Sequence, residues 1–560
     1  MPPSREPTKR PPASRQNTLL PRADNAPPAP GPRFRLERAV IGEERLNASA
    51  LLDAQLDGGR GERAALLSAS GEITYRQLAA LTGAVASYLK TLGIEREQRV
   101  LMILDDSPAF PAAFLGAMRI GAVPVPVNPM DRVDNYAYYL DDSYAKVLFV
   151  EASLLPALEA VLAARPWLSV VVVDGDAGPH TSFATLAAAH AGELPPPLDT
   201  HREDMAFWLY SSGSTGRPKG VVHTHGDIGV TVDQYARNVL RISESDVCYS
   251  TTKLFHAYGL GNSLSFPLSV GACSTLVKGR STPDLIFATL GRIRPTLFFS
   301  VPALYAAMVR TAGASEVDFS CVRACVSAAE ALPAAVLARW QELTGVPILD
   351  GIGSTEMLHI YCSNTLEDLA PGTSGKPVPG YELRLVDEHG LDVAAGEAGD
   401  LMVRGESCAA YYWHQRAKTR FSMRGDWFHT GDRYLVDAEG HYVYQGRSDD
   451  MIKVGGLWVS PADVESCLVR HPVVSEAAVI GMRIEEVSRI KAFVITGTAP
   501  EDPEALADEL RQWCKQNLRR YEYPHVIEFV EDLPRTPTGK VQRYKLREAE
   551  AVQATLAGAG

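Results

Sequence analysis

Residues 207–220, which read Phe-Trp-Leu-Tyr-Ser-Ser-Gly-Ser-Thr-Gly-Arg-Pro-Lys-Gly, decide the fold of this chain. The apolar run from Phe207 to Tyr210 predicts a strand, and a segment rich in glycine and hydroxyl groups follows it. That composition is typical of a phosphate-cradling loop, because glycines let backbone N–H groups turn toward an anion and a lysine adds charge. The residues that we expect to contact phosphate are Ser211, Ser212, Gly213, Ser214, Thr215, Gly216 and Lys219.

The segment is not a Walker A loop. That motif reads Gly-x-x-x-x-Gly-Lys-Ser/Thr and opens a helix, whereas here Pro218 precedes Lys219 and Gly220 follows it. Taken alone, the stretch is also compatible with a flexible surface loop.

Length, charge and cysteine content bound the class of protein. A chain of 560 residues is too long for one hydrophobic core, so we expect two or more domains. A net charge of -12 argues against a nucleic-acid partner, since such proteins carry excess Lys and Arg to neutralise phosphate. No apolar run approaches the ~18 residues that a membrane helix needs, so no membrane partner is expected. The eight cysteines lack zinc-ligand spacing, which favours reduced thiols and a cytoplasmic location.

The two ends of the chain are expected to be disordered. Residues 1–32 are rich in Pro, Arg and Ser and contain no apolar core for a secretory signal. A transit peptide is a weaker alternative, because Pro2, Pro3 and Pro7 oppose the amphipathic helix that such a peptide forms. Residues 551–560 form the second predicted tail.

Residues 33–446 are predicted to form a large α/β domain. Short apolar runs alternate with helical stretches, which indicates α/β layering. The proline-rich run 123–127 is predicted as an edge strand or a turn, because proline cannot donate to a sheet ladder. Alternating residues at 381–386 and 400–404 predict antiparallel strands in a β-rich subdomain. The clearest strand candidates of the layered part are Val100 to Leu104, Val147 to Val150, Val170 to Val173 and Leu297 to Val301.

Residues 451–550 are predicted to form a small, separate α/β domain. Its strand candidates are 477–480, 492–495 and 526–530, and a helix starting near Pro503 fits between them. An apolar stripe on that helix is expected to be core, and consists of Leu506, Leu510, Trp513, Cys514 and Leu518.

Five further motifs follow the opening loop in a fixed order. They are 350–356 (Asp-Gly-Ile-Gly-Ser-Thr-Glu), 430–432 (Thr-Gly-Asp), 445–450 (Gln-Gly-Arg-Ser-Asp-Asp), 453–456 (Lys-Val-Gly-Gly) and 537–540 (Pro-Thr-Gly-Lys). Together with the loop, this set resembles the adenylate-forming superfamily of acyl- and aryl-CoA synthetases, adenylation domains and luciferases. The resemblance covers nearly the whole chain after the tail. It implies that ATP activates a carboxylate as an acyl adenylate before a thiol attacks it.

The resemblance assigns roles in that first step. Lys540 matches the family's catalytic lysine, whose ammonium stabilises charge on the carboxylate and α-phosphate oxygens. Glu356, helped by Thr355, matches the magnesium-binding carboxylate. On the residues alone, Lys540 could be an ordinary exposed lysine and Glu356 a helix-capping residue.

The nucleotide contacts follow from the same resemblance. Asp432 and Arg447 match ribose-binding residues, although each alone could be a salt-bridge partner. Two segments are expected to sandwich adenine, namely Asp350, Gly351 and Ile352 on one side and Ala328, Ala329 and Glu330 on the other.

The second step is expected to use a moved small domain. Asp449, in the 447–450 segment, falls at the family's hinge, and Lys453, Gly455 and Gly456 match the segment that lines the pantetheine tunnel of CoA. A simple β-hairpin turn fits the Lys453 to Gly456 residues equally well.

The acyl pocket resembles that of benzoate-CoA ligases and their aryl relatives, through segments 253–262 and 351–360. A flat slot for an aromatic ring is expected there, and plain core packing is the alternative for each residue. The pocket residues are Ala257, Tyr258, Gly353, His359 and Ile360.

Two residues depart from the benzoate-CoA ligase pattern. His256 stands where phenylalanine is expected, and it is predicted to gate the pocket between the two steps. Ala329 stands where glycine is expected, and its methyl group would alter the ring substituents that are accepted, so an amino- or hydroxybenzoate is included among the candidates.

The expected protein is therefore an ATP- and Mg²⁺-dependent aryl-CoA ligase of aromatic acid metabolism, with CoA as co-substrate. A stand-alone enzyme that loads a carrier-protein thiol is the rival enzyme, and a catalytically dead binding protein is the rival of another class. The oligomeric state is open, with a homodimer as one option.

Overall fold

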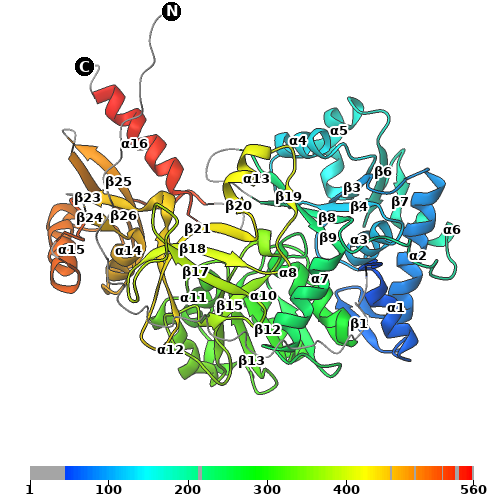
Figure 1. Cartoon of the computed structure of the whole chain (residues 1–560), viewed down its shortest axis with the longest axis horizontal. Coiled ribbons are helices and arrows are strands. Elements are labelled where there is room, and N and C mark those ends of the chain that lie inside the picture. The colour runs from blue at the N-terminus through cyan, green and yellow to red at the C-terminus, as the bar shows by residue number, and fades with distance from the viewer. Residues whose placement is uncertain are drawn as a thin grey trace, which may run out of the picture. The chain divides into compact units, whose positions relative to one another are not determined.

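The computed structural model describes residues 44–211, 217–454, 457–484, 487–519, 521–535 and 541–557, and Figure 1 labels many of their helices and strands. The chain is a mixed α/β protein with a large amino-terminal domain and a smaller carboxy-terminal one. The predicted tail 1–32, loop residues 212–216, Gly455, Gly456 and the 537–540 motif with Lys540 lie outside the described residues.

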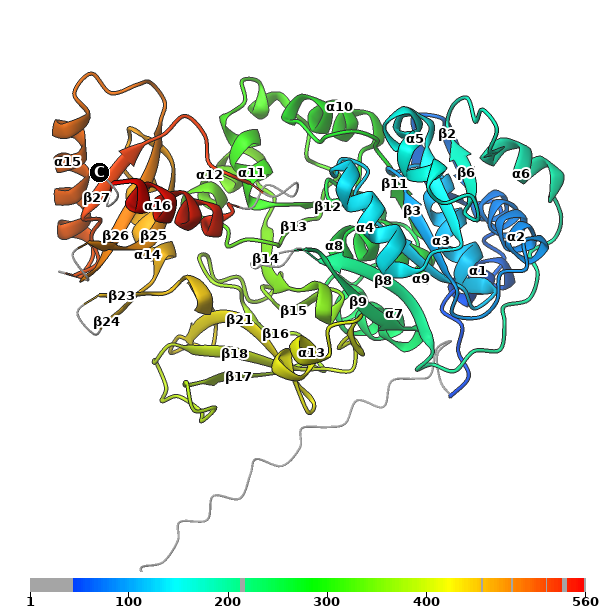
Figure 2. The ribbon, with the colours of Figure 1, turned by 90° about the horizontal axis from the view of Figure 1, so that it is seen from above.

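A parallel five-stranded sheet in the order β4-β3-β5-β6-β7 carries the first part of the large domain. All of β5 is buried, as expected for an apolar run in a parallel sheet covered on both faces. Strand β4 lies at an edge, which confirms the edge-strand prediction for the proline-rich run. Helices α2 and α3 lie side by side next to this sheet (Figure 2). The elements are β3 (Arg99–Ile103), β4 (Val123–Pro126), β5 (Val147–Glu151), β6 (Ser169–Val173), β7 (Thr181–Ser182), α2 (Tyr75–Thr91), α3 (Ala109–Arg119), α4 (Val133–Ser143), α5 (Leu155–Ala163) and α6 (Phe183–Ala189).

A nine-stranded sheet in the order β16-β15-β14-β13-β12-β10-β11-β1-β2 forms the second part. Its middle strands, from β14 to β1, are parallel, and antiparallel strands flank them on both sides. Its strands are β1 (Ala64–Ser68), β2 (Gly71–Thr74), β10 (Val247–Ser250), β11 (Cys273–Thr275), β12 (Leu297–Ser300), β13 (Ala324–Ser327), β14 (Ile348–Gly353), β15 (Ile360–Ser363) and β16 (Lys376–Pro377). The accompanying helices are α1 (Ala50–Asp57), α7 (His225–Thr231), α8 (Ala257–Leu260), α9 (Phe266–Val270), α10 (Pro283–Ile293), α11 (Pro302–Arg310) and α12 (Ala334–Thr344).

A three-stranded antiparallel sheet joins distant parts of the large domain. Strand β8 (Met205–Ser211) and strand β9 (Lys219–Thr224) form an antiparallel hairpin. In sequence, the predicted phosphate-binding segment lies between them. Strand β19 (Tyr411–Tyr412) pairs with β9. This pairing sets Tyr412 opposite Val221, close to Lys219.

The predicted β-rich subdomain is an antiparallel five-stranded sheet. It contains β17 (Glu382–Val386), β18 (Gly399–Arg404), β20 (Met423–Arg424), β21 (Trp427–Val436) and β22 (Tyr442–Arg447), with α13 (Arg416–Ser422) beside it. The antiparallel pairing of β17 with β18 confirms the two strands expected from the alternating residues.

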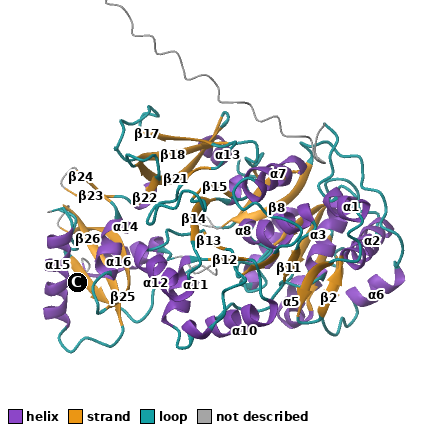
Figure 3. Ribbon diagram, turned by 90° about the horizontal axis from the view of Figure 1, so that it is seen from below, coloured by secondary structure: helices purple, strands orange, loops and turns teal. Residues whose placement is uncertain are grey.

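The carboxy-terminal part contains a hairpin and a three-stranded sheet, beside which α14, α15 and α16 lie (Figure 3). Asp502 caps α15 by accepting from Ala505 N at 3.1 Å, and Pro503 occupies its first turn. Leu510 and Cys514 of the predicted stripe are fully buried in the core. The elements are β23 (Ile452–Val454), β24 (Leu457–Val459), β25 (Val474–Ile484), β26 (Val487–Thr496), β27 (Val526–Phe529), α14 (Pro461–Val469), α15 (Pro503–Asn517) and α16 (Arg543–Ala557).

Candidate active site

Glu356 is the centre of a buried cluster of charged and polar groups. Its Oε1 accepts hydrogen bonds from Lys219 Nζ and from Tyr412 Oη, both at 2.8 Å. The Lys219 ammonium also lies 4.0 Å from the centre of the Tyr412 ring, within range of a cation–π interaction. Burial alone would raise the pKa of Glu356, but the charge and hydrogen bond of Lys219 and the hydroxyl of Tyr412 outweigh it and hold that pKa below its ordinary value. Glu356 is therefore an ionised carboxylate in a buried site.

The backbone around Glu356 is fixed from two sides. Ser354 Oγ accepts from Met357 N at 3.2 Å and caps the 3₁₀ turn Thr355–Met357. The Thr355 carbonyl lies 2.8 Å from His223 Nε2, and the other ring nitrogen of His223 lies 2.7 Å from Asp227. This chain of contacts orients the turn that presents Thr355 and Glu356.

Asp432 and Arg447 are cross-strand neighbours on β21 and β22. Arg447 Nη1 lies 3.1 Å from Asp432 Oδ1 and donates to Thr430 O at 3.1 Å. Gly431 has a φ of 76°, and a Cβ at this position would lie only 2.8 Å from Arg447 Nη2. The positive φ of Gly431, which lies within β21, favours glycine, and the missing Cβ leaves room for the Arg447 guanidinium.

Tyr361 is a fully buried side chain on β15. Burial raises its pKa well above the ordinary value, and the nearby charges of Asp432 and Glu356 raise it further.

The two predicted adenine segments end adjacent parallel strands, because Ser327 on β13 pairs with Asp350 on β14. Burial raises the pKa of Asp350 to about 7, and its Oδ2 accepts from Leu332 N at 3.4 Å. Ala328 is buried, whereas Ala329 is exposed and adopts a φ of 84°, in the left-handed region that favours glycine.

The predicted aryl-pocket residues gather around His359, which is 2% exposed. Its Nε2 donates to Asn262 Oδ1 at 3.1 Å, and its ring centre lies 5.4 Å from that of Tyr258. Tyr258 Oη donates to Val326 O at 3.1 Å, so the ring is anchored at its far end. Burial lowers the pKa of His359 to about 3, so the ring is neutral. Burial raises the pKa of Tyr258 well above its ordinary value, and the charge of Asp350 adds to this shift. Because Tyr258 bonds to Val326 on β13, the cluster adjoins the strand that leads to Ala328.

Glycines allow the close packing behind these rings. A Cβ on Gly353 would lie 2.5 Å from the carbonyl oxygen of His359, and one on Gly261 would lie 2.4 Å from its Cδ2. A Cβ on Gly351 would lie 3.0 Å from Ile360 Cγ2. Ala257 and Ile360 are buried beside them.

The predicted residues Lys453 and Asp449 lie on other segments than the residues around His359, whereas His256 adjoins α8. His256 is half-buried immediately before α8, with its ring centre 4.6 Å from that of Phe255. Lys453 is exposed on β23, and the backbone of Asp449 lies in the short turn Ser448–Asp450. The side chain of Asp449 lies outside those that the structure describes.

Two residues that bond to the predicted site residues were not named among them. Tyr412 reaches Glu356 only through the pairing of β19 with β9, and Asn262 reaches His359 across 97 residues. The aromatic run Tyr411-Tyr412-Trp413 is the one local signal for the first, and it gives no indication of the partner.

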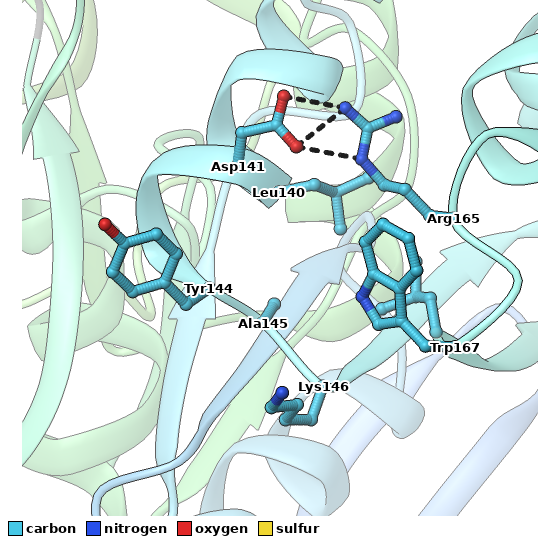
Figure 4. A pocket seen from close by; sticks show the side chains of 8 residues that line it. Leu140, Asp141, Tyr144, Ala145, Lys146, Arg165 and Trp167 are labelled. Atoms are coloured by element: carbon cyan, nitrogen blue, oxygen red, sulfur yellow. Dashed lines mark hydrogen bonds and ion pairs between the residues drawn. The ribbon is translucent and has the colours of Figure 1, made fainter.

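A separate hollow of about 330 Å³ lies at the carboxyl end of α4 and is shown in Figure 4. None of the predicted site residues line it. Its walls are Leu140, Asp141, Tyr144, Ala145, Lys146, Arg165, Trp167 and Leu168.

No group of three or more His, Cys, Asp or Glu side chains is placed to hold a metal ion within the described ranges. In the same part of the chain, no helix has the length and apolarity needed to cross a membrane.

The chain matches two family descriptions, AMP-binding enzyme over residues 52–413 and AMP-binding enzyme C-terminal domain over residues 463–540. The chain belongs to the AMP-binding enzyme family. The domain boundaries at 446 and 451 remain predictions.

Its relatives narrow the class further. A benzoate-CoA ligase of Thauera aromatica is 47% identical over 90% of this chain and 96% of its own length. A 4-hydroxybenzoate-CoA/benzoate-CoA ligase of Rhodopseudomonas palustris is 42% identical over 89% and 93%. Among solved structures, the anthranilate CoA ligase AuaEII in complex with anthranoyl-AMP has a TM-score of 0.87 at 41% identity, covering 92% of this chain and 99% of its own. This protein is thus an AMP-forming acid-thiol ligase of the benzoate-CoA ligase type, within the aryl-CoA ligases.

Proposed function

We propose that this enzyme converts benzoate or a substituted benzoate, such as an amino- or hydroxybenzoate, to its CoA thioester through an acyl adenylate. In the first step, which requires Mg²⁺, the carboxylate attacks the α-phosphorus of ATP and pyrophosphate leaves. In the second step the CoA thiol attacks the acyl carbon of the adenylate and AMP leaves. The observation that carries the proposal is the meeting of two sites. Buried Glu356, bonded to Lys219 and Tyr412, lies in one cluster. The ring-lined cluster around His359 lies beside the strand that leads to the adenine segment, through the bond of Tyr258 to Val326.

The polar cluster fits magnesium. Mg²⁺ binds through one or two carboxylates and keeps its other positions for water and phosphate oxygens, so a single ionised Glu356 suits it. Glu356, helped by Thr355, would hold the ion, which would neutralise triphosphate charge. Lys219 and Tyr412 both bind Oε1 and fix the carboxylate's orientation.

The chain's other polar residues would bind the rest of the nucleotide. Asp432 would accept hydrogen bonds from the ribose hydroxyls, and Arg447, which is already aligned with Asp432, would add a second contact. Residues 211–219 would surround the phosphates. Lys540 would stabilise the charge that develops as the carboxylate attacks the α-phosphorus.

The ring-lined cluster supports an aromatic acid. His359 is neutral and its Nε2 is already bonded to Asn262, so the cluster presents ring faces and small residues to a flat substrate. Relatives named for benzoate, 3-hydroxybenzoate, 4-hydroxybenzoate and anthranilate ligation support the class without selecting the substituent. The proposed roles of His256 as a gate, and of Asp449, Lys453, Gly455 and Gly456 in the CoA step, rest on the sequence resemblance alone.

A coupled assay for AMP release, with ATP, Mg²⁺, CoA and a panel of benzoates, tests the proposal. We expect AMP release that depends on the benzoate and on CoA. No turnover with any benzoate would refute it, and turnover only with a carrier-protein thiol in place of CoA would favour the rival acceptor.

A further inference from the structure

Helix α4 faces both ends of the loop that joins β8 to β9. In this hairpin Tyr210 pairs with Gly220 and Ser211 pairs with Lys219, so Tyr210 precedes the loop and Pro218 closes it. We call the residues 210–211 and 217–219 the two stems of the loop. Everything that follows concerns these stems, which the structure describes.

Two side chains of α4 contact the stems, one on each side. Tyr138 Oη donates to the carbonyl oxygen of Pro218 at 2.9 Å, and the Arg217 guanidinium lies 5.2 Å from the centre of the Tyr138 ring. Asp142 Oδ2 accepts from Tyr210 Oη at 2.6 Å. Because Tyr138 and Asp142 are four residues apart, they lie on the same face of the helix. One helical face therefore spans the base of the loop.

In the contact with Asp142, the Tyr210 phenol stays protonated and is the donor. Burial raises the pKa of Tyr210 well above its ordinary value, and the hydrogen bond and charge of Asp142 raise it further, so the phenol keeps its proton and donates. Trp413 Nε1 donates to the carbonyl oxygen of Asp142 at 2.8 Å, which fixes this end of α4 in turn.

The outer face of the same helix is tied down as well. Arg165, which follows α5, forms a two-pronged ion pair with Asp141, with contacts of 2.7 Å to both carboxylate oxygens (Figure 4). Its Nη1 also donates to Val161 O at 2.8 Å. The helix is thus held on one face while its other face holds the stems.

We infer that Tyr138 and Asp142 are positioning residues for ATP, which act by holding the two stems of the phosphate loop in place before the nucleotide binds. The inference rests on the proposed role of residues 211–219 in phosphate binding. Ordering a loop costs conformational entropy, so stems that are fixed in advance reduce the loss on binding. Neither residue needs to touch ATP.

The test compares three variants, Tyr138→Phe, Asp142→Asn and, as a control, Tyr144→Phe. Tyr144 is at the end of the same helix, is largely exposed and lines the hollow at the carboxyl end of α4 (Figure 4). The dissociation constant for ATP is measured by calorimetry without aryl acid, and KM for ATP and for benzoate is measured in the AMP-release assay. Thermal melting reports folding.

We expect the dissociation constant and KM for ATP to rise about 3- to 10-fold in Tyr138→Phe, which loses one hydrogen bond at a stem. In Asp142→Asn we expect a rise of about 2- to 5-fold, since the amide oxygen still accepts from Tyr210 but lacks the charge of the carboxylate. KM for benzoate stays unchanged in both variants, and the control Tyr144→Phe keeps the wild-type dissociation constant and KM for ATP.

Unchanged ATP affinity in folded variants would overturn the inference, and so would an equal rise in KM for ATP and KM for benzoate. If Asp142→Asn does not fold, Tyr138→Phe, which removes one hydroxyl, decides alone. A wild type that binds ATP but activates no benzoate refutes the proposed function and leaves the affinity comparison valid.

Discussion

The nucleotide side of the candidate site consists of charged pairs, whereas the aryl side consists of neutral, packed rings. On the nucleotide side, charges face each other in pairs, as Lys219 does with Glu356 and Arg447 does with Asp432. On the aryl side, His359 is neutral and packs among the rings of Tyr258, Tyr235 and Phe266. A triphosphate needs fixed charge, whereas a benzene ring needs shape, so each side suits one half of the substrate pair.

This difference explains which side carries recognisable motifs. Charge chemistry permits few residue types, because only certain groups can pair with phosphate, ribose or a metal ion. A packed slot permits many combinations of similar volume. The comparison predicts that variants on the two sides affect different substrates and respond to different pH ranges.

The largest expected effect is that of Lys540→Ala on the nucleotide side. Loss of one charge-stabilising donor should slow adenylation about 100-fold or more. Thioester formation from supplied benzoyl adenylate should be spared, because the lysine is assigned to the first step only. Pyrophosphate exchange and thioester assays measure the two steps, and Lys545→Ala, an exposed lysine on α16, is the control. Equal loss in both steps would contradict the division of roles.

Acid should destabilise the aryl side before the nucleotide side. The pKa of His359 is lowered to about 3 from its ordinary 6.5, so its neutral burial favours the folded state above pH 6.5 and that contribution declines as the pH falls below it. Glu356 has a pKa below its ordinary 4.5, so its contribution declines only below about that pH.

Between pH 7 and pH 5, His359 should therefore account for about 2 kcal/mol of lost unfolding free energy. Urea titrations of the wild type and of His359→Gln at both pH values check this. The unfolding free energy of the variant should fall less than that of the wild type over this range. Equal losses would show that a group other than His359 causes the pH dependence.

Tyr412→Phe should have a smaller effect, confined to the nucleotide side. It removes one of the two hydrogen bonds to Glu356 Oε1, and a single such bond contributes about 1 kcal/mol, or roughly fivefold. KM for ATP with Mg²⁺ should rise by that factor while KM for benzoate stays constant. A rise in KM for benzoate alone would contradict the assignment of Tyr412 to the nucleotide side.

The smallest effect is expected at the junction of the two sides. Ala329 has a φ of 84°, so Ala329→Gly should relieve backbone strain and raise the unfolding free energy by about 0.5 kcal/mol after the entropy cost of glycine. Ala328→Gly is the control and should lower it, because Ala328 is buried and has no positive φ. Parallel losses in the two variants would show that Ala329 is unstrained.

Strands, helices and short contiguous motifs were predictable from the sequence because they depend on residues that are neighbours in the chain. The edge strand β4, the antiparallel pair β17 and β18 and the capped helix α15 all follow local patterns. The partners of Glu356 were not predictable, since Lys219 is 137 residues away and Tyr412 arrives on a two-residue strand. Long-range pairing depends on the packing of whole sheets, which no local pattern encodes.

The preference for an aromatic acid is tested most directly by a competition assay that gives the enzyme benzoate and a straight-chain acid, hexanoate, together with ATP, Mg²⁺ and CoA. Mass spectrometry then quantifies the CoA products. A flat, ring-lined slot beside a charged nucleotide site predicts that benzoyl-CoA dominates and that one AMP forms per thioester. A product mixture dominated by hexanoyl-CoA, or AMP without any thioester, would contradict the account.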